Sequence, residues 1–237
     1  MRWQRPFNFK DMIVTVDGPG GAGKSTISRI LARRLGLPCL NSGYIYRAVT
    51  LLALEDGGAF EDRERVARII QKMNLRFQED PEKTRVFAGD REITSRLKDP
   101  DVTPQIHRIA SNAHYRSLLV DLQRRFAQPH GVVAEGRDMG TVIFPNADFK
   151  FYLDASPEER ARRQHRELEA AGHARSFSDV LSDVLERDRH ERQREIAPLR
   201  VPPGAVVIQN DSLSIREVVD AMMSHIKAPP AGTGRPP

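Results

Sequence analysis

The 237-residue sequence holds a single cysteine, Cys39, so no disulfide bond can form within the chain. We interpret Cys39 as a small buried residue rather than a nucleophile, because it sits in a short apolar stretch. A lack of disulfides is typical of a reducing compartment and predicts a cytoplasmic location. No apolar run approaches the length of a membrane span, so no association with a membrane is expected.

Aromatic residues are also scarce, at 6% of the chain. Basic residues exceed acidic ones, 37 to 32, for a formal net charge of +5, and arginine outnumbers lysine. This excess could serve a nucleic-acid surface or hold a small polyanion. The basic residues are not interleaved with aromatic ones, and arginine suits bidentate capture of phosphate. We therefore favour a small polyanion and expect no nucleic-acid partner.

What the sequence does contain is a glycine-rich run between an apolar stretch at 12–16 and a helical pattern at 25–35. The run matches G-x-x-x-x-G-K-[ST], the motif of the phosphate-binding P-loop. Glycines let the backbone curl so that several N–H groups face one anion, and the start of the helix adds the positive end of its dipole. The predicted ATP-binding residues of this run are Gly18, Pro19, Gly20, Gly21, Ala22, Gly23, Lys24, Ser25 and Thr26.

Two side chains of the run have distinct predicted roles. Lys24 should reach the β- and γ-phosphates, and the hydroxyl of Ser25 should ligate Mg²⁺. The simpler alternative is a glycine-rich turn with an incidental lysine. The position between a strand and a helix favours binding of a nucleotide triphosphate.

The hydrophobic pattern predicts an α/β fold. Five apolar runs read as strands, at 12–16, 37–40, 131–135, 149–153 and 205–208. Helical patterns fall at 25–35, 44–54, 62–73, 104–113, 115–127, 157–171, from 180 past 187, and at 212–226. Because strands alternate with helices, we expect a five-stranded parallel sheet covered by helices on both faces.

Three parts of the chain differ from this alternation. Residues 74–97 alternate apolar and polar side chains between turns, which predicts two or three antiparallel strands as an insertion. Residues 1–10 are basic and irregular and are interpreted as a flexible leader. Residues 228–237 are rich in proline and glycine and are predicted to be disordered. One domain is therefore expected over 11–227.

Two pairs of polar residues lie where a second anion could bind. Ser42 is predicted to cap the helix after the second strand, and Arg47 follows on that helix, so together they could hold an anion opposite the P-loop. Arg137 and Asp138 come directly after a buried strand, at the edge where open α/β sheets bind ligands. The alternatives are a solvent-exposed cap with a surface arginine in the first case and a structural ion pair in the second.

A third charged group lies near the end of the chain. Arg187, Glu191 and Arg194 have the i, i+4, i+7 spacing that places them on one face of a helix. A solvated, salt-bridged helix face would show the same pattern. The sequence has neither an N/T-K-x-D run, which GTPases use to read guanine, nor an L-S-G-G-Q run of transporters, and it is short for a motor.

Four stretches resemble the cytidylate kinase family, the bacterial CMP kinases. They are 18–26, 41–47 (N-S-G-Y-I-Y-R), 135–145 (E-G-R-D-M-G-T-V-I-F-P) and 187–199, and the resemblance extends over 12–226. It implies a P-loop kinase fold in which the small antiparallel insertion belongs to a lobe for the nucleoside monophosphate, at about 42–110. It also implies a helical lid at about 156–190.

The resemblance further implies a role for each matched side chain. The phosphate of CMP would be held by Ser42, Arg47, Arg137 and Arg194. Arg116 and Asp138 would face the cytosine edge, and Arg187 and Glu191 would meet the ribose hydroxyls and nearby phosphate. Arg160 and Arg163 of the lid would close over ATP. The catalytic residues expected on this basis are Lys24, Arg137, Arg187 and Arg194.

The sequence departs from the family pattern at four positions. Asn41, Glu135 and Glu191 stand where aspartates are usual, and His107 aligns with a serine that some members place against the base. These changes bear on the choice among CMP, dCMP and UMP rather than on the phosphate chemistry.

The reaction expected is direct, in-line transfer of the γ-phosphoryl group of ATP to CMP or dCMP, with Mg²⁺, by a monomer. The attacking phosphate is already anionic at neutral pH, since its second pKa lies near 6, so no general base is needed. The alternatives are a P-loop kinase for UMP, dTMP or AMP, a basic ATP-dependent RNA-binding protein, and a nucleotide-gated interaction module without transfer chemistry.

Overall fold

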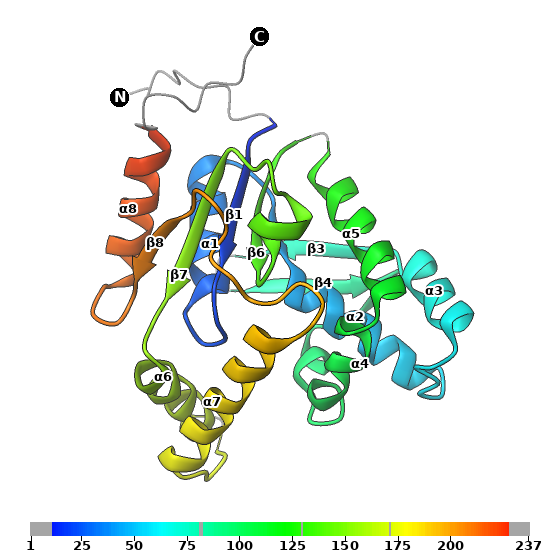
Figure 1. The fold of residues 1–237 in the computed structure, drawn as a ribbon. Helices are drawn as coiled ribbons and strands as arrows, with labels where there is room; N and C mark the ends of the chain where they lie inside the picture. The colour runs from blue at the N-terminus through cyan, green and yellow to red at the C-terminus, as the bar shows by residue number, and fades with distance from the viewer. Residues whose placement is uncertain (1–10, 81–82, 129, 171, 228–237) are drawn as a thin grey trace.

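The computed structural model describes residues 11–80, 83–128, 130–170 and 172–227. A five-stranded parallel sheet with the strand order β2-β6-β1-β7-β8 forms its centre (Figure 1). The strands are β1 (Ile13–Asp17), β2 (Cys39–Asn41), β6 (Val132–Gly136), β7 (Phe149–Asp154) and β8 (Val206–Gln209). The predicted parallel sheet is confirmed, with strand ends that differ from the expected ones by one or two residues.

Helices cover both faces of this sheet (Figure 1). The helices of the described residues are α1 (Lys24–Leu35), α2 (Ser42–Glu55), α3 (Arg63–Lys72), α4 (Ile106–Ala110), α5 (Ala113–Ala127), α6 (Pro157–Ala170), α7 (Phe177–Gln193) and α8 (Ile215–Lys227). Val14 and Val16 of β1 pack with α1 and α8, whereas Val132 and Ala134 of β6 pack with α2, α3 and α5. Since alternate residues of a strand point to opposite faces, the two faces carry separate hydrophobic clusters.

The predicted insertion is an antiparallel sheet of three strands, β3 (Leu75–Glu79), β4 (Thr84–Ala88) and β5 (Arg91–Glu92). Val86 of β4 packs with Ala48 and Leu51 of α2, in a cluster that also includes Leu97. The 3₁₀ turns η1 (Ser95–Lys98) and η2 (Thr103–Gln105) connect this sheet to α4. The insertion is therefore attached to the main domain through α2.

Helices α6 and α7 pack together beyond the carboxyl ends of the parallel strands (Figure 1). Ala161, Val180 and Val184 form a small hydrophobic cluster between the two helices. Ser176 caps the first turn of α7 by accepting a hydrogen bond from Asp179 N. Helix α7 begins three residues before the predicted start at 180 and ends at Gln193. Arg187 and Glu191 lie in its C-terminal half.

Two local predictions were wrong. Ser42 is the first residue of α2, and the side chain of Asn41 is its N-cap, accepting a hydrogen bond from Tyr44 N at 3.1 Å. The helix predicted at 104–113 is η2 followed by the short α4, because Asn112 caps α5 and ends the preceding helix. The predicted leader, the predicted tail and the predicted helix end at residue 171 lie outside the described residues. Among the described helices, none has the length and apolar content to cross a bilayer.

Candidate active site

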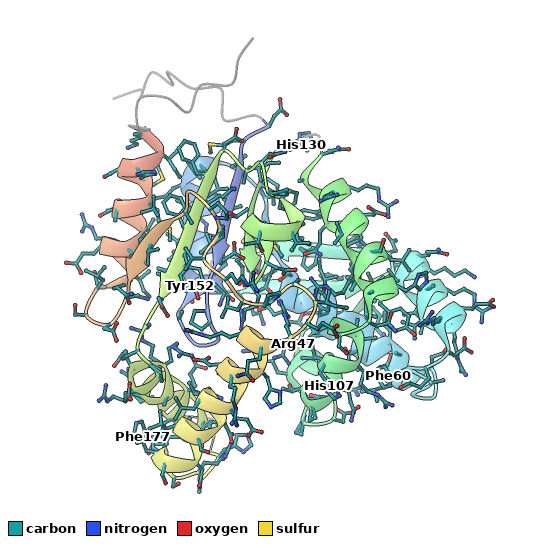
Figure 2. The ribbon with its side chains drawn as sticks, in the orientation of Figure 1. Arg47, Phe60, His107, His130, Tyr152 and Phe177 are labelled. Atoms are coloured by element: carbon teal, nitrogen blue, oxygen red, sulfur yellow. The ribbon has the colours of Figure 1, made fainter. Side chains whose placement is uncertain are left out.

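A cleft of about 1500 Å³ lies at the carboxyl ends of the parallel strands, and all predicted site residues except Gly18, Pro19, Ala22 and Arg160 line it. Its lining comes from the P-loop, from α2, α4 and α5, from the end of β6, and from α6 and α7. Figure 2 shows Arg47 and His107 on the α2 and α4 side of the space that faces α7, whereas Phe177 lies at the outer end of the α6–α7 pair. Most of the residues expected to hold two nucleotides thus lie around one cavity.

The P-loop connects β1 to α1 by a backbone path that only glycine permits at its first position. Gly18 has a φ of 147°, and a Cβ there would lie 2.0 Å from the carbonyl oxygen of Leu153. Gly23 is the N-cap of α1 with a φ of 92°. The first turn of α1 therefore opens directly into the cleft, with its unpaired N–H groups and positive dipole end available to an anion.

Lys24 is buried at the base of the P-loop, with 5% of the residue exposed. Its Nζ donates a hydrogen bond to the carbonyl oxygen of Pro19 at 2.7 Å. Burial, assisted by the nearby charge of Arg137 and opposed by Glu135, lowers the pKa of Lys24 to about 7. A triphosphate bound here would give the ammonium a negatively charged partner and would raise its pKa.

Three oxygen- or amide-bearing side chains meet beside the P-loop. Ser25 Oγ donates a hydrogen bond to Glu135 Oε1 at 2.6 Å, and Asn41 Nδ2 donates one to Ser25 Oγ at 3.2 Å. The residues come from α1, from β6 and from the end of β2, where Asn41 stands opposite Glu135 in the register. This hydroxyl–carboxylate pair suits a hard cation, which prefers oxygen ligands.

Arg137 and Glu191 form an ion pair across the cleft, with Nε of Arg137 2.7 Å from Glu191 Oε2. Burial lowers the pKa of Arg137, but the charge and hydrogen bond of Glu191 raise it by more, so the pKa lies above its usual value. Burial likewise raises the pKa of Glu191, but Arg137 and Lys24 lower it below its usual range. Both groups therefore stay charged beside Lys24.

Two further arginines have buried nitrogens with no hydrogen-bond partner in the described part of the chain. They are Nε of Arg187 and Nη2 of Arg194. Burial, with a contribution from neighbouring arginines, lowers the pKa of both guanidinium groups. A buried donor without an acceptor costs about 1–3 kcal/mol. An anion bound in the cleft would remove this cost.

Arg47 and Ser42 line the same cleft from α2. Arg47 Nη1 donates hydrogen bonds to Thr103 Oγ1 at 2.8 Å and to the carbonyl oxygen of Leu97 at 3.1 Å. Burial and the charges of Arg187 and Arg137 lower its pKa. The structure therefore brings Arg47 together with the other predicted anion-binding arginines.

The far end of the cleft holds a buried ion pair between Arg116 of α5 and Asp138, both with 5% of the side chain exposed. The guanidinium of Arg116 lies 5.7 Å from the centre of the Tyr46 ring and donates a hydrogen bond to the carbonyl oxygen of Ala110 at 3.4 Å. His107 lines the same wall, and its Nδ1 lies 2.7 Å from the carbonyl oxygen of Pro104. Since a carbonyl oxygen only accepts, Nδ1 carries the proton and a neutral ring leaves Nε2 as an acceptor.

Arg160 and Arg163, the two predicted lid arginines, have different surroundings. Arg163 lines the cleft and donates hydrogen bonds to Glu159 Oε1 at 3.0 Å and to the carbonyl oxygen of Asn210. Arg160 is 1% exposed, and all three of its guanidinium nitrogens bond to protein acceptors. The expectation that Arg160 closes over ATP does not match its position, because four of its five N–H groups bond within the protein and the residue does not line the cleft.

Sequence reasoning did not single out Asp17 or Asn210. Asp17 accepts hydrogen bonds from Met139 N at 2.7 Å and Gly140 N at 2.8 Å, at the start of the π-helical turn η3 (Met139–Ile143). Burial raises the pKa of Asp17 to about 7, against the effect of these two bonds. Asn210 donates a hydrogen bond to the carbonyl oxygen of Ala22 at 2.9 Å. Both are polar residues at the carboxyl end of a strand, which is the signal that could have identified them.

Residues 14–228 match the family model described as cytidylate kinase. A cytidylate kinase of Carboxydothermus hydrogenoformans is 40% identical over 215 residues, which are 91% of this chain and 97% of that protein. A cytidylate kinase of Exiguobacterium sp. is 42% identical over 213 residues, or 90% and 95% of the two chains. A crystal structure of an uncharacterized protein from Eubacterium ventriosum has a TM-score of 0.52 at 10% identity and covers 92% of this chain and 99% of its own, a likeness of fold alone.

Proposed function

The chain belongs to the cytidylate kinase family, and we propose that it transfers the γ-phosphoryl group of ATP to CMP and to dCMP, forming ADP and CDP or dCDP. The observation that carries this proposal is the convergence of a P-loop and the side chains of Arg47, Arg137, Arg187 and Arg194 on one cleft. A site for ATP alone needs the P-loop, whereas four further arginines suit a second phosphate.

ATP would bind at the P-loop end of the cleft. The N–H groups at the start of α1 would hold the β-phosphate, and Lys24 would leave the carbonyl oxygen of Pro19 to reach the β- and γ-phosphates. Arg163 of α6, which lines the cleft, would approach the same phosphates. Thr26, at the start of α1, lines the cleft beside Lys24.

The residues present fit a Mg²⁺ ion that accompanies ATP. Ser25 Oγ and the carboxylate of Glu135 would hold it, while Asn41 Nδ2 orients the hydroxyl of Ser25. In the described residues no cluster of three or more His, Cys, Asp or Glu side chains could form a metal cage. That suits Mg²⁺, which commonly takes one or two protein ligands together with phosphates and water. When bound, the ion neutralises phosphate charge.

CMP would place its phosphate among the arginines and its base at the Arg116–Asp138 pair. Ser42, Arg47, Arg137 and Arg194 would bind the phosphate oxygens, and Arg187 and Glu191 would contact the ribose and the adjoining phosphate. The Asp138 carboxylate accepts hydrogen bonds, so it favours the amino group of cytosine over the O4 acceptor of uracil. His107 Nε2, also an acceptor in the neutral ring, would act in the same direction.

The chemical step is an in-line attack by a CMP phosphate oxygen on the γ-phosphorus of ATP, with ADP as the leaving group. Two unit charges 4 Å apart repel by about 4 kcal/mol at an effective dielectric constant near 20. Lys24, Arg137 and Arg187 offset this repulsion and stabilise the charge on the transferring group. The attacking oxygen is already ionised at neutral pH, so the protein needs no general base.

Closure of the cleft would keep water away from the phosphoryl group. We assign the monophosphate lobe to about 42–110 and the lid to about 156–190. These segments carry α2 to α4 with the small sheet on one side of the cleft and α6 with α7 on the other.

A panel of monophosphates in an assay of ADP release tests the proposal. The purified protein with Mg-ATP should turn over CMP and dCMP at least tenfold faster, by kcat/KM, than UMP, dTMP or AMP. Chromatography should show CDP as the second product. A faster rate with one of the other three nucleotides, or ADP release that is independent of any monophosphate, would contradict the proposed substrate.

A further inference from the structure

Arg160 is a completely buried charged side chain that joins three segments of the chain. It lies on α6, and its Nη1 and Nη2 bond to both carboxylate oxygens of Asp188 on α7, with Nη1 2.9 Å from Oδ1. Nη1 also donates to the carbonyl oxygen of Gly20 in the P-loop at 3.1 Å. Nε donates to the carbonyl oxygen of Ala155, just after β7, at 2.9 Å.

The bond to Gly20 fixes one peptide plane of the P-loop. In a trans peptide the C=O and the following N–H point in opposite directions. Because the carbonyl oxygen of Gly20 faces Arg160, the N–H of Gly21 points away from Arg160. The glycine at 21 also allows close contact, since a Cβ there would lie 3.2 Å from Cβ of Arg160. Arg160 therefore determines how this turn of the loop presents its donors.

The bond to Asp188 fixes the neighbouring Arg187. Asp188 and Arg187 are adjacent on α7, and the guanidinium of Arg187 lies 2.9 Å from the point that a Cβ at Gly20 would occupy. Arg187 contacts α6 through a 3.3 Å bond from Nη2 to Gln164 Oε1, while its buried Nε has no partner among the described residues. Arg187 is thus a charged donor whose position over the P-loop depends on the helix that carries it.

We propose that Arg160 is a positioning residue: paired with Asp188, it holds Arg187 over Gly20 and orients the Gly20–Gly21 peptide, without touching either nucleotide. It follows that α6 and α7 are fixed to the P-loop at Arg160 and Asp188. The inference rests on the proposed function only in taking ATP as the phosphoryl donor.

A replacement of the whole pair separates positioning from stability. Removing one partner would leave a buried charge, whereas replacing both with apolar residues of similar size is often neutral for stability. We therefore choose the double variant Arg160→Met with Asp188→Leu. We expect kcat to fall at least tenfold and the Kd for ATP, measured by calorimetry, to rise. The KM for CMP should rise by a smaller factor than the Kd for ATP, because CMP loses only part of its contact with Arg187, whereas ATP also loses the oriented Gly20–Gly21 peptide. The thermal midpoint should fall only modestly, because the carbonyl oxygens of Gly20 and Ala155 lose a donor but no charge is left unpaired.

The exposed pair Arg175–Asp183, which also involves α7, provides the matched control. Its double alanine variant should keep wild-type kinetics. If the Met/Leu variant fails to fold, Arg160→Lys provides a second test, because it keeps the charge but loses the planar guanidinium group. It should lower kcat and weaken ATP binding more than it raises the KM for CMP. Wild-type kcat and ATP affinity in the folded pair replacement or in Arg160→Lys would overturn the inference.

The two proposals fail in different ways. A wild-type protein that forms no CDP contradicts the proposed function. The Kd for ATP needs no CMP, so an unchanged ATP affinity in the variants still contradicts the positioning role. An equal loss with ATP and with CMP also contradicts it, because it would indicate a general disturbance of the fold.

Discussion

Lys24 is a buried cation in a pocket that already contains Arg137. Without a nucleotide, its hydrogen bond to the carbonyl oxygen of Pro19 is a neutral substitute for a phosphate oxygen. The phosphate oxygen carries a negative charge that the carbonyl oxygen does not, so the ammonium gains Coulomb attraction when a phosphate replaces the carbonyl. The residue is therefore arranged for a ligand rather than for stability.

Substitution Lys24→Ala should reduce kcat by at least a hundredfold while the fold survives. In the proposed complex the ammonium contacts the transferring phosphate, where charge stabilisation is worth several kcal/mol. In the free protein it makes one backbone bond, to the carbonyl oxygen of Pro19. Steady-state kinetics with CMP and circular dichroism test both parts. Near-normal turnover would contradict the assignment of Lys24.

The lowered pKa of Lys24 predicts a pH-dependent stability in the absence of nucleotides. Between pH 7 and about 10 the unfolded chain keeps the proton on this lysine while the folded protein has lost it, so stability should rise with pH, by at most about 1.4 kcal/mol per unit. Urea unfolding of wild type and Lys24→Met should show this rise in the wild type alone. The exposed Lys72, replaced by Met, provides the control. Equal pH slopes in wild type and Lys24→Met would contradict the effect.

Arg194 has a buried Nη2 without a partner in the described chain and lies near Asp138 and Arg116, on the CMP side of the cleft. Hydrogen bonds to charged groups contribute about 1.5–3 kcal/mol. Arg194→Ala should therefore lower kcat/KM for CMP by about 10- to 100-fold and leave the Kd for ATP within threefold. Equal losses for the two nucleotides, measured by kinetics and calorimetry, would argue against a role in CMP binding.

The start of α2 links the stability of an element to the site. Asn41 uses its Oδ1 to cap the helix and its Nδ2 to orient Ser25. Asp62 caps α3 by a similar bond to Arg65 N at 3.0 Å but does not line the cleft. Asp62 is therefore a control for Asn41, since both cap a helix but only Asn41 also bonds to Ser25.

Replacing each cap by alanine should cost about 1 kcal/mol in the free energy of unfolding. Asn41→Ala should in addition raise the Mg²⁺ concentration that gives half-maximal rate, by about threefold or more, whereas Asp62→Ala should leave it unchanged. Urea unfolding and a Mg²⁺ titration of the rate measure the two effects. An identical Mg²⁺ dependence in both variants would contradict the role of Asn41.

Elements with a strong local pattern could be predicted from the sequence. The strand before the P-loop and the strand just before Arg137 are short apolar runs, and their carboxyl ends must meet at one edge of a parallel sheet. That rule is enough to bring Lys24 and Arg137 together. The side-chain cap of α2 could not be assigned between Asn41 and Ser42, because both residue types cap helices well and they are adjacent.

Contacts between distant segments could not be predicted. Asn210 bonds to Ala22, 188 residues away, and Asp17 bonds to Met139, 122 residues away. The burial of Arg160 depends on Asp188, 28 residues further on, which only the packing of α6 on α7 brings within reach. A sequence pattern shows that such charged side chains exist but not which of them satisfy one another.

At the scale of the whole molecule, the net charge of +5 has a local cause. Seven arginines and three lysines line one cleft, against five acidic residues, which are Glu79, Glu135, Asp138, Glu167 and Glu191. Such a concentration of cations focuses the electrostatic field on a small anion. The same charge spread over an open surface would suit a nucleic acid instead.

The central claim is that one cleft holds ATP and CMP with their phosphates in contact. The most direct test is calorimetric titration with a bisubstrate ligand, adenosine and cytidine joined through their 5′ oxygens by five phosphates. One molecule should bind per chain, more tightly than either ATP or CMP, and saturating ATP and saturating CMP should each abolish its high-affinity binding. Binding of two molecules per chain, or competition with only one of the two nucleotides, would show that the sites are separate.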